Sequence, residues 1–93
     1  MSSHYSFPRT KFVNESGITR QLFHMASELW EIIKALAVGN LEHAIHEAFD
    51  LIGSTETLIR KIVKRAWSKG LMVNPMMIKY QVEEKNRKRG YYE

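Results

Sequence analysis

Apolar residues follow a helical spacing through the first half of the chain. Between about Ser16 and Val38 they recur at steps of three and four residues, which places them on one stripe of a helix. The stripe contains Leu22, Met25, Ala26, Leu29, Ile32, Ile33 and Leu36. Gly39 and Asn40 come next, a pair typical of a helix end followed by the cap of a new helix. The pattern therefore predicts a helix over about residues 16–38.

A second apolar stripe follows in the next segment. Its members are Ile45, Phe49, Ile52, Ile59, Val63 and Ala66, and they stay within about 60° of one direction on a helix with 3.6 residues per turn. The stripe passes through Gly53 without a change of phase, which favours one long helix over residues 41–68. A break near Gly53 is the alternative, because Ser54 and Thr55 are competent helix caps.

The last third of the chain contains a third helical signal. Asn74 is suited to cap a helix, and Pro75 is favoured at the first helical position. Together with Gly90 beyond the end, they predict a helix over residues 75–88 and a short tail. Residues 1–14 show no periodicity, and we expect them to form a flexible arm.

Length and composition fit a single all-α domain spanning residues 1–93. Hydrophobic residues make up 44% of the chain, enough for one modest core. No apolar run approaches the roughly 20 residues that cross a bilayer, and the N-terminus lacks the features of a secretion signal. We therefore expect a soluble, cytoplasmic protein without a membrane partner. The absence of cysteine excludes disulfides, thiolate nucleophiles and cysteine zinc sites.

Such a small helical domain buries little apolar surface by itself. The long apolar stripes, together with Trp30 and Trp67, require a second layer of helices. We therefore expect a bundle of three to four helices per chain that is completed by oligomerisation, as a homodimer or homotetramer.

Charge is unevenly distributed along the chain. Residues 21–56 contain six acidic residues and a single lysine, whereas residues 57–93 contain ten Lys and Arg against three Glu. A chain of this kind can hold a cation on its acidic part and a polyanion on its basic part.

The acidic part contains two pairs of carboxylates at a spacing of three residues. Glu28 and Glu31 belong to the first predicted helix, and Glu47 and Asp50 belong to the second. Each pair shares one face of its helix, away from the apolar stripe, and the tight connection between the helices makes them antiparallel. Four converging carboxylates without His or Cys suit Mg²⁺ or Mn²⁺, which also accept phosphate oxygens as ligands.

A solvated acidic face is the ordinary interpretation of one such pair. Exposed helix faces usually carry Lys or Arg four residues after Glu. Here those positions are Ile32, Ala35, Leu51 and Ser54. The lack of Lys or Arg at these positions leaves the acidic charge unbalanced, which favours a bound cation.

At this point the sequence resembles a known family. The residues Ser27-Glu28-Leu29-Trp30-Glu31 and, after a gap, Glu47-Ala48-Phe49-Asp50 are similar to the E-E-x-x-E…E-x-x-D signature of the MazG-like, all-α nucleoside triphosphate pyrophosphohydrolases. The likeness covers about residues 20–92. It includes a basic ending with Arg-Gly-Tyr, similar to that of short phage-type members.

The resemblance implies that Glu28, Glu31, Glu47 and Asp50 are Mg²⁺ ligands. It further implies cleavage of an NTP or dNTP to the monophosphate and pyrophosphate. Ser27 replaces the first Glu of the signature, and this departure leaves open a slow, a selective or an inactive enzyme. Among the carboxylates, Glu28 and Glu31 are the catalytic candidates for taking a proton from the attacking water.

The basic last third offers groups that bind phosphate oxygens or a nucleotide. The candidates for substrate binding are Lys79, Lys85, Asn86, Arg89 and Tyr91. For any one of the cations, a solvated position near a helix C-terminus is an equally good interpretation.

Two other functions are compatible with the sequence. A small nucleic-acid-binding or regulatory protein would use a basic stripe formed by Arg60, Lys61, Lys64, Arg65 and Lys69. A catalytically inactive MazG-like chain would act as a structural partner.

Overall fold

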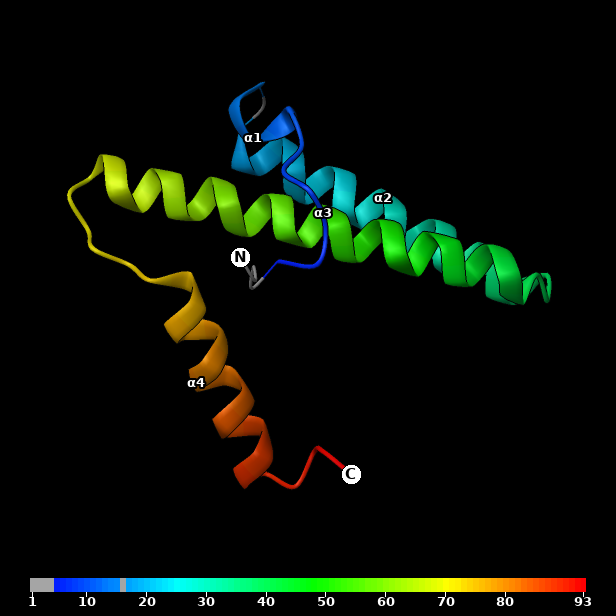
Figure 1. Ribbon diagram of the computed structural model, residues 1–93. Coiled ribbons are helices and arrows are strands. Elements are labelled where there is room, and N and C mark those ends of the chain that lie inside the picture. Colours follow the sequence, from blue (N-terminus) through cyan, green and yellow to red (C-terminus); the bar gives the residue numbers. More distant parts are fainter. Residues whose placement is uncertain (1–4, 16) are drawn as a thin grey trace.

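The structure is a computed structural model that describes residues 5–15 and 17–93. Within these residues it contains four helices and no strand (Figure 1), which confirms the predicted all-α class. The helices are α1 (Phe12–Glu15), α2 (Ile18–Ala37), α3 (Leu41–Ser68) and α4 (Pro75–Lys88).

Helices α2 and α3 form an antiparallel hairpin that makes up most of the molecule (Figure 1). Gly39, with φ of +76°, turns the chain after α2, and the Asn40 side chain accepts a hydrogen bond from the His43 amide at 3.1 Å. α3 runs without interruption through Gly53, which decides between the two alternatives left open by the sequence. The predicted first helix began at Ser16, which lies outside the described residues.

Helix α4 begins as its local sequence predicts. The Asn74 side chain accepts a hydrogen bond from the Met77 amide at 3.2 Å, and Pro75 occupies the first helical position. The connection from α3 turns at Gly70, with φ of +79°, and is held by a hydrogen bond from Trp67 Nε1 to the Val73 carbonyl. In Figure 1 α4 points away from the hairpin, and none of its residues is buried.

A flexible arm was expected over residues 1–14. From residue 5 onward, however, the structure places this segment against α3, and residues 1–4 lie outside the described part. The amides of Ser6 and Phe7 donate to the two Glu56 carboxylate oxygens at 2.7 and 2.8 Å, and Arg60 donates to the Phe7 carbonyl at 3.1 Å. These contacts join residues about 50 positions apart, so they leave no periodic pattern in the sequence.

The least exposed positions of α2 and α3 face each other along the hairpin, and we call this line of contact the seam. On α2 they are Ile18, Gln21, Met25, Glu28, Glu31, Ile32 and Ala35, and on the facing part of α3 they are Ala44, Glu47, Ala48, Leu51 and Ser54. The seam is closed by small residues near the turn, where Ala35 and Ala44 are buried. Gln21 is buried as well, and its Nε2 donates to the Ser54 carbonyl at 2.9 Å.

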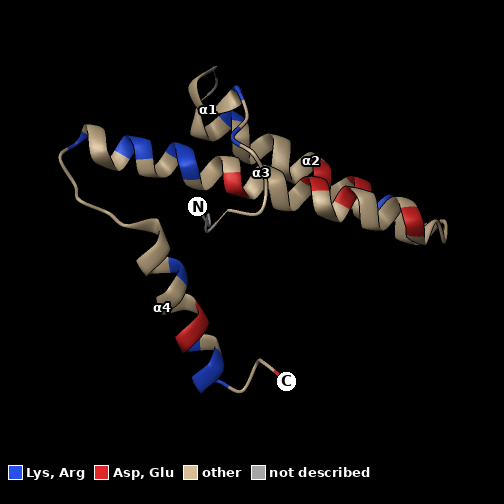
Figure 2. Cartoon of the chain, in the orientation of Figure 1, with Lys and Arg blue, Asp and Glu red and all other residues tan. Residues whose placement is uncertain are grey.

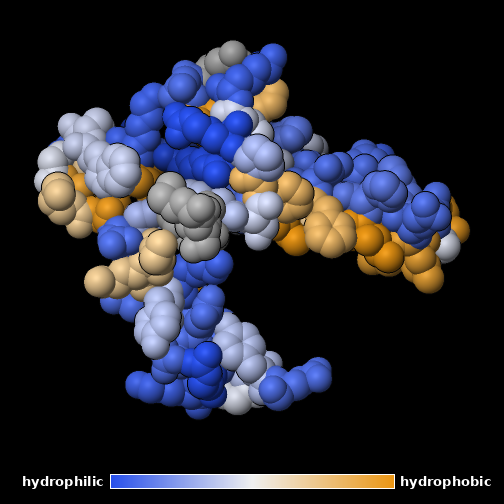
Figure 3. Space-filling model, in the orientation of Figure 1, coloured by the Kyte–Doolittle hydropathy of each residue, from blue (hydrophilic) through white to orange (hydrophobic). Residues whose placement is uncertain are grey.

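Apart from Met25 and Ile32, the large residues of the two apolar stripes do not form this seam. These residues lie one position further along each helix, and because the helices are antiparallel both stripes fall on the same side of the hairpin. We call this side the apolar face; it contains Leu22, Leu29, Ile33 and Leu36 from α2 and Ile45, Ile52, Ile59 and Ile62 from α3, all exposed. Within one chain the large residues of the two stripes therefore lie side by side on the surface of the hairpin. Figure 3 shows hydrophobic side chains along the α3 edge of the hairpin.

Charge is segregated in space as it is in the sequence. Figure 2 shows acidic residues along the half of the hairpin near its turn, and basic residues on the C-terminal half of α3 and on α4. In the part of the chain that the structure describes, no helix has the length and apolar character needed to span a bilayer.

Candidate functional site

The four predicted carboxylates lie in the same stretch of the hairpin, two on each helix. Glu28 and Glu47 occupy seam positions, where their side chains are only 12% and 18% exposed. Glu31 is half-exposed and Asp50 is exposed, at the edge of the seam. The hairpin thus brings together residues that are 16 to 22 positions apart, because its antiparallel register sets the turn of Glu28 level with the turn of Glu47 and Asp50.

Three of these carboxylates have a basic neighbour on their own helix. His24 Nε2 lies 3.6 Å from a Glu28 oxygen and His43 Nε2 lies 3.6 Å from a Glu47 oxygen, each pair one turn apart. Glu31 forms an ion pair with Lys34 at 2.9 Å. At 3.6 Å the histidines are too distant for hydrogen bonds, and they carry charge only when protonated.

Glu28 has an oxygen with no hydrogen-bond partner. Its Oε1 atom is buried, and among the described residues it is the one buried side-chain nitrogen or oxygen left unsatisfied. Buried polar atoms nearly always have partners, because losing water without a replacement costs about 1–3 kcal/mol, and more for a charged group. His24 Nε2 lies 3.6 Å from this same atom, beyond hydrogen-bond distance, so a cation or a donor from outside the chain would fit beside it.

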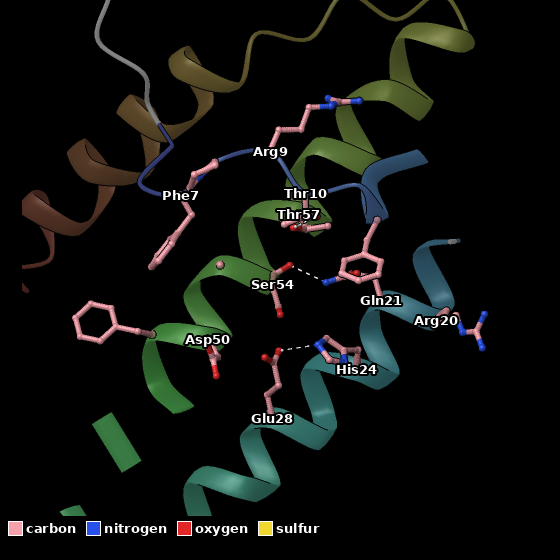
Figure 4. A pocket seen from close by; sticks show the side chains of 14 residues that line it. Phe7, Arg9, Thr10, Arg20, Gln21, His24, Glu28, Asp50, Ser54 and Thr57 are labelled. Carbon is pink, nitrogen blue, oxygen red and sulfur yellow. Dashed lines mark hydrogen bonds and ion pairs between the residues drawn. The ribbon is translucent and has the colours of Figure 1, made fainter. Parts of the chain in front are cut away.

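A pocket of about 630 Å³ opens beside Glu28. In Figure 4 the Glu28 and Asp50 side chains point toward each other across one end of it, while Phe7, Thr10 and Thr57 lie toward the other end. The pocket is bounded by α2, by α3 and by the N-terminal segment, which we define as residues 5–15.

The donor set fits the predicted Mg²⁺ or Mn²⁺. Carboxylate oxygens are the ligands these ions prefer, and the Glu28 and Asp50 side chains lie across one end of the pocket from each other. In the side-chain positions of the structure, no three His, Asp or Glu side chains within residues 5–15 and 17–93 are close enough together to hold a metal. Glu31, Glu47 and Glu28 are instead turned toward Lys34, His43 and His24.

Ser27, which departs from the family signature, faces solvent. Its hydroxyl donates to the His24 carbonyl of the preceding turn at 2.7 Å. A serine that bonds back to its own helix in this way makes no contact with the pocket.

The predicted substrate-binding residues of the last third lie apart from this pocket. Lys79 and Lys85 are on α4, and none of the set lines the pocket of its own chain. Asn86 contacts the Tyr92 hydroxyl at 3.4 Å, and the Arg89 guanidinium lies 5.9 Å from the centre of the Tyr91 ring. A single copy of the chain therefore does not bring these groups to the carboxylates.

The basic stripe proposed for nucleic acid is partly occupied by the N-terminal segment. Arg60 binds the Phe7 carbonyl, Lys61 donates to the Phe12 carbonyl and Lys64 donates to Asn14. Lys61 is buried. Burial lowers the pKa of its ammonium group below the ordinary value, and the neighbouring Lys64 charge lowers this pKa further.

Sequence reasoning missed one end of the pocket. The residues concerned are Phe7, Arg9, Thr10, Arg20, Gln21, Ser54 and Thr57. Gln21 could have been found, because it precedes Glu28 by two turns and so shares its face. The others lie in or opposite the N-terminal segment, whose position carries no local signal.

Comparison of the chain with protein-family models, with curated proteins and with solved structures gives no match.

Proposed function

We propose that this protein is a Mg²⁺-dependent, MazG-like nucleotide pyrophosphohydrolase of the cytoplasm. The observation that carries the proposal is the pair Glu28 and Asp50, whose side chains point toward each other across one end of a pocket large enough for a nucleotide, together with a buried Glu28 oxygen that makes no hydrogen bond. A cation bound between the two side chains would supply the partner that His24, at 3.6 Å, does not provide as a hydrogen bond.

Glu28, Glu31, Glu47 and Asp50 would hold the Mg²⁺, or Mn²⁺ in its place. An ion held by these carboxylates would neutralise charge on the triphosphate and would make a bound water molecule more acidic. Glu28 and Glu31 are the residues we assign to accept the proton of the attacking water.

We further propose that two copies pair through the apolar face, as a homodimer or as half of a homotetramer. Within the described residues the buried apolar side chains are Val13, Ala35 and Ala44, and no large side chain is fully buried. A second hairpin laid on the apolar face supplies the missing layer. It also supplies a second α4. The substrate-binding candidates of that copy would then lie near the carboxylates of the first copy, and they are Lys79, Lys85, Asn86, Arg89 and Tyr91.

A pyrophosphate-release screen of the eight common NTPs and dNTPs with Mg²⁺ tests the proposal. We expect release from one or a few nucleotides and its loss in Glu47→Gln, which keeps the shape of the side chain but removes its charge. Glu83→Gln, a matched change on α4, serves as the control and keeps the activity. Absence of release from all eight nucleotides contradicts the enzyme and favours a catalytically inactive structural partner.

A further inference from the structure

The pocket extends beyond the carboxylates, and its far end is closed by the N-terminal segment. Phe7, Pro8, Arg9 and Thr10 form this wall, opposite the middle of α3. None of the four belongs to the acidic cluster or to α4. The wall therefore needs an explanation separate from metal binding.

The backbone of Phe7 is fixed on both sides. Its amide and that of Ser6 donate to Glu56, and its carbonyl accepts from Arg60. The Arg60 guanidinium also lies 4.0 Å from the centre of the Tyr5 ring, and burial raises the pKa of the Tyr5 hydroxyl. The backbone of residues 6 and 7 is thus held by Glu56 and Arg60. These contacts leave the Phe7 side chain to line the pocket.

The Phe7 ring lies beside Gly53 at the edge of the pocket. A Cβ atom at Gly53 would be 3.7 Å from the Phe7 ring, so the ring is in ordinary contact distance of α3. Phe12 and Phe49 line the same pocket. Three aromatic side chains around a largely apolar cavity make a typical surface for a flat ring system.

Polar groups are interspersed among these aromatic side chains. The Gln21 amide is fixed by its bond to the Ser54 carbonyl, and the Thr10 and Thr57 hydroxyls lie 3.1 Å apart. A few fixed donors and acceptors within an apolar lining are what distinguishes one heterocycle from another. Arg20 adds a cation at the rim.

We infer that the N-terminal segment forms the base-binding end of the nucleotide pocket, with Phe7 as the stacking surface for a nucleobase. The inference rests on the proposed function, because it places the phosphates at Glu28 and Asp50. Along α3, Asp50 and Thr57 are separated by about 10 Å, given the rise of 1.5 Å per residue. The phosphate end and the base end of the pocket are therefore distinct, and different residues would contact the ligand at each end.

Binding of AMP, GMP, CMP and UMP to the full chain in EDTA tests the base end without the metal. Ribose 5-phosphate is the base-free comparison, and affinities are measured from NMR chemical-shift changes. We expect at least one of the four nucleotides to bind more tightly than ribose 5-phosphate. Phe7→Ala should weaken that binding about five-fold or more, which is the lower end of the range for base–aromatic stacking.

Two further variants sharpen the test. Phe7→Leu keeps an apolar side chain beside Gly53 but removes the aromatic face, so we expect the same loss without a change of fold. Phe23→Ala removes an aromatic ring that is 72% exposed on α2, outside the pocket, and should leave the affinity unchanged.

Two outcomes overturn the inference. One is equal affinity of all four nucleotides and ribose 5-phosphate for the unmodified chain, and the other is undiminished binding by Phe7→Leu. Neither outcome depends on pyrophosphate release, so a failure of the hydrolase proposal is recognised separately, as silence in the release screen.

Discussion

Thermal unfolding with and without Mg²⁺ tests the metal site directly, because a buried Glu28 oxygen makes no hydrogen bond and lies 3.6 Å from His24 Nε2. Leaving such a group unsatisfied costs about 1–3 kcal/mol. A bound ion satisfies the oxygen, and its net stabilisation of the fold, which already includes this gain, is about 1.4 kcal/mol when Mg²⁺ is present at ten times its Kd. For a domain of this size that corresponds to a rise in Tm of about 6–11 °C.

The variant Glu28→Gln separates the cost of the unsatisfied oxygen from the stabilisation by Mg²⁺. Without Mg²⁺ we expect it to unfold at a higher temperature than the parent chain, by about 4–8 °C per kcal/mol recovered, because no charge remains at the buried position. With Mg²⁺ we expect no further rise, because a ligand has been lost. Circular dichroism follows the unfolding in EDTA and in MgCl₂, at one protein concentration and matched ionic strength.

Glu83→Gln on α4 is the control for this experiment, and its Tm should respond to Mg²⁺ as the parent does. The reasoning is refuted if the parent chain has the same Tm in EDTA and in MgCl₂. It is equally refuted if Glu28→Gln retains the full Mg²⁺ response, since the unsatisfied oxygen then takes no part in binding.

Two more predictions concern the fold. We expect Ile33→Lys, which puts a charge on the apolar face, to convert the assembly seen by sedimentation velocity into monomers. The control is Met72→Lys, at a side chain that is 95% exposed in the connection between α3 and α4, and it should leave the assembly intact. A parent chain that sediments as a monomer contradicts the pairing. We expect Gly53→Ala to raise the free energy of unfolding by about 0.5–1 kcal/mol, because alanine favours the helix and its Cβ meets the Phe7 ring at an ordinary distance. A lower Tm for Gly53→Ala in thermal unfolding would contradict this arrangement, because it would mean that the added methyl group has no room beside the Phe7 ring.

The helices could be predicted from the sequence because their ends are encoded locally. Asn40 and Asn74 each cap the helix that follows, and the caps are visible in the sequence as Asn after Gly or before Pro. The continuity of α3 followed from the phase of its apolar residues across Gly53. These features depend on neighbours within a few residues, where propensity and capping dominate.

The face on which the hairpin closes could not be predicted in the same way. Hydrophobic periodicity indicates that a face will be covered, but not whether the cover comes from the same chain. Here the hairpin closes on a mixed face with Ala35, Ala44 and Gln21, and leaves the apolar face outside. The N-terminal segment was missed for a related reason, since Glu56 and Arg60 hold it through its backbone, which has no side-chain signature.

The closure of the hairpin on its mixed face also explains how the Glu28 and Glu47 side chains come to be largely covered. A seam built from the apolar stripes would be more stable for one chain, because burying charge is costly where apolar packing is available. That arrangement would leave Glu28 and Glu47 in water, where each would bind a cation weakly. Closing on the other face partly desolvates both side chains and leaves the apolar surface for a second copy. The face on which the hairpin closes thus links the proposed metal site to the proposed pairing. The metal ion would neutralise the covered carboxylates, and the second copy would cover the exposed apolar face.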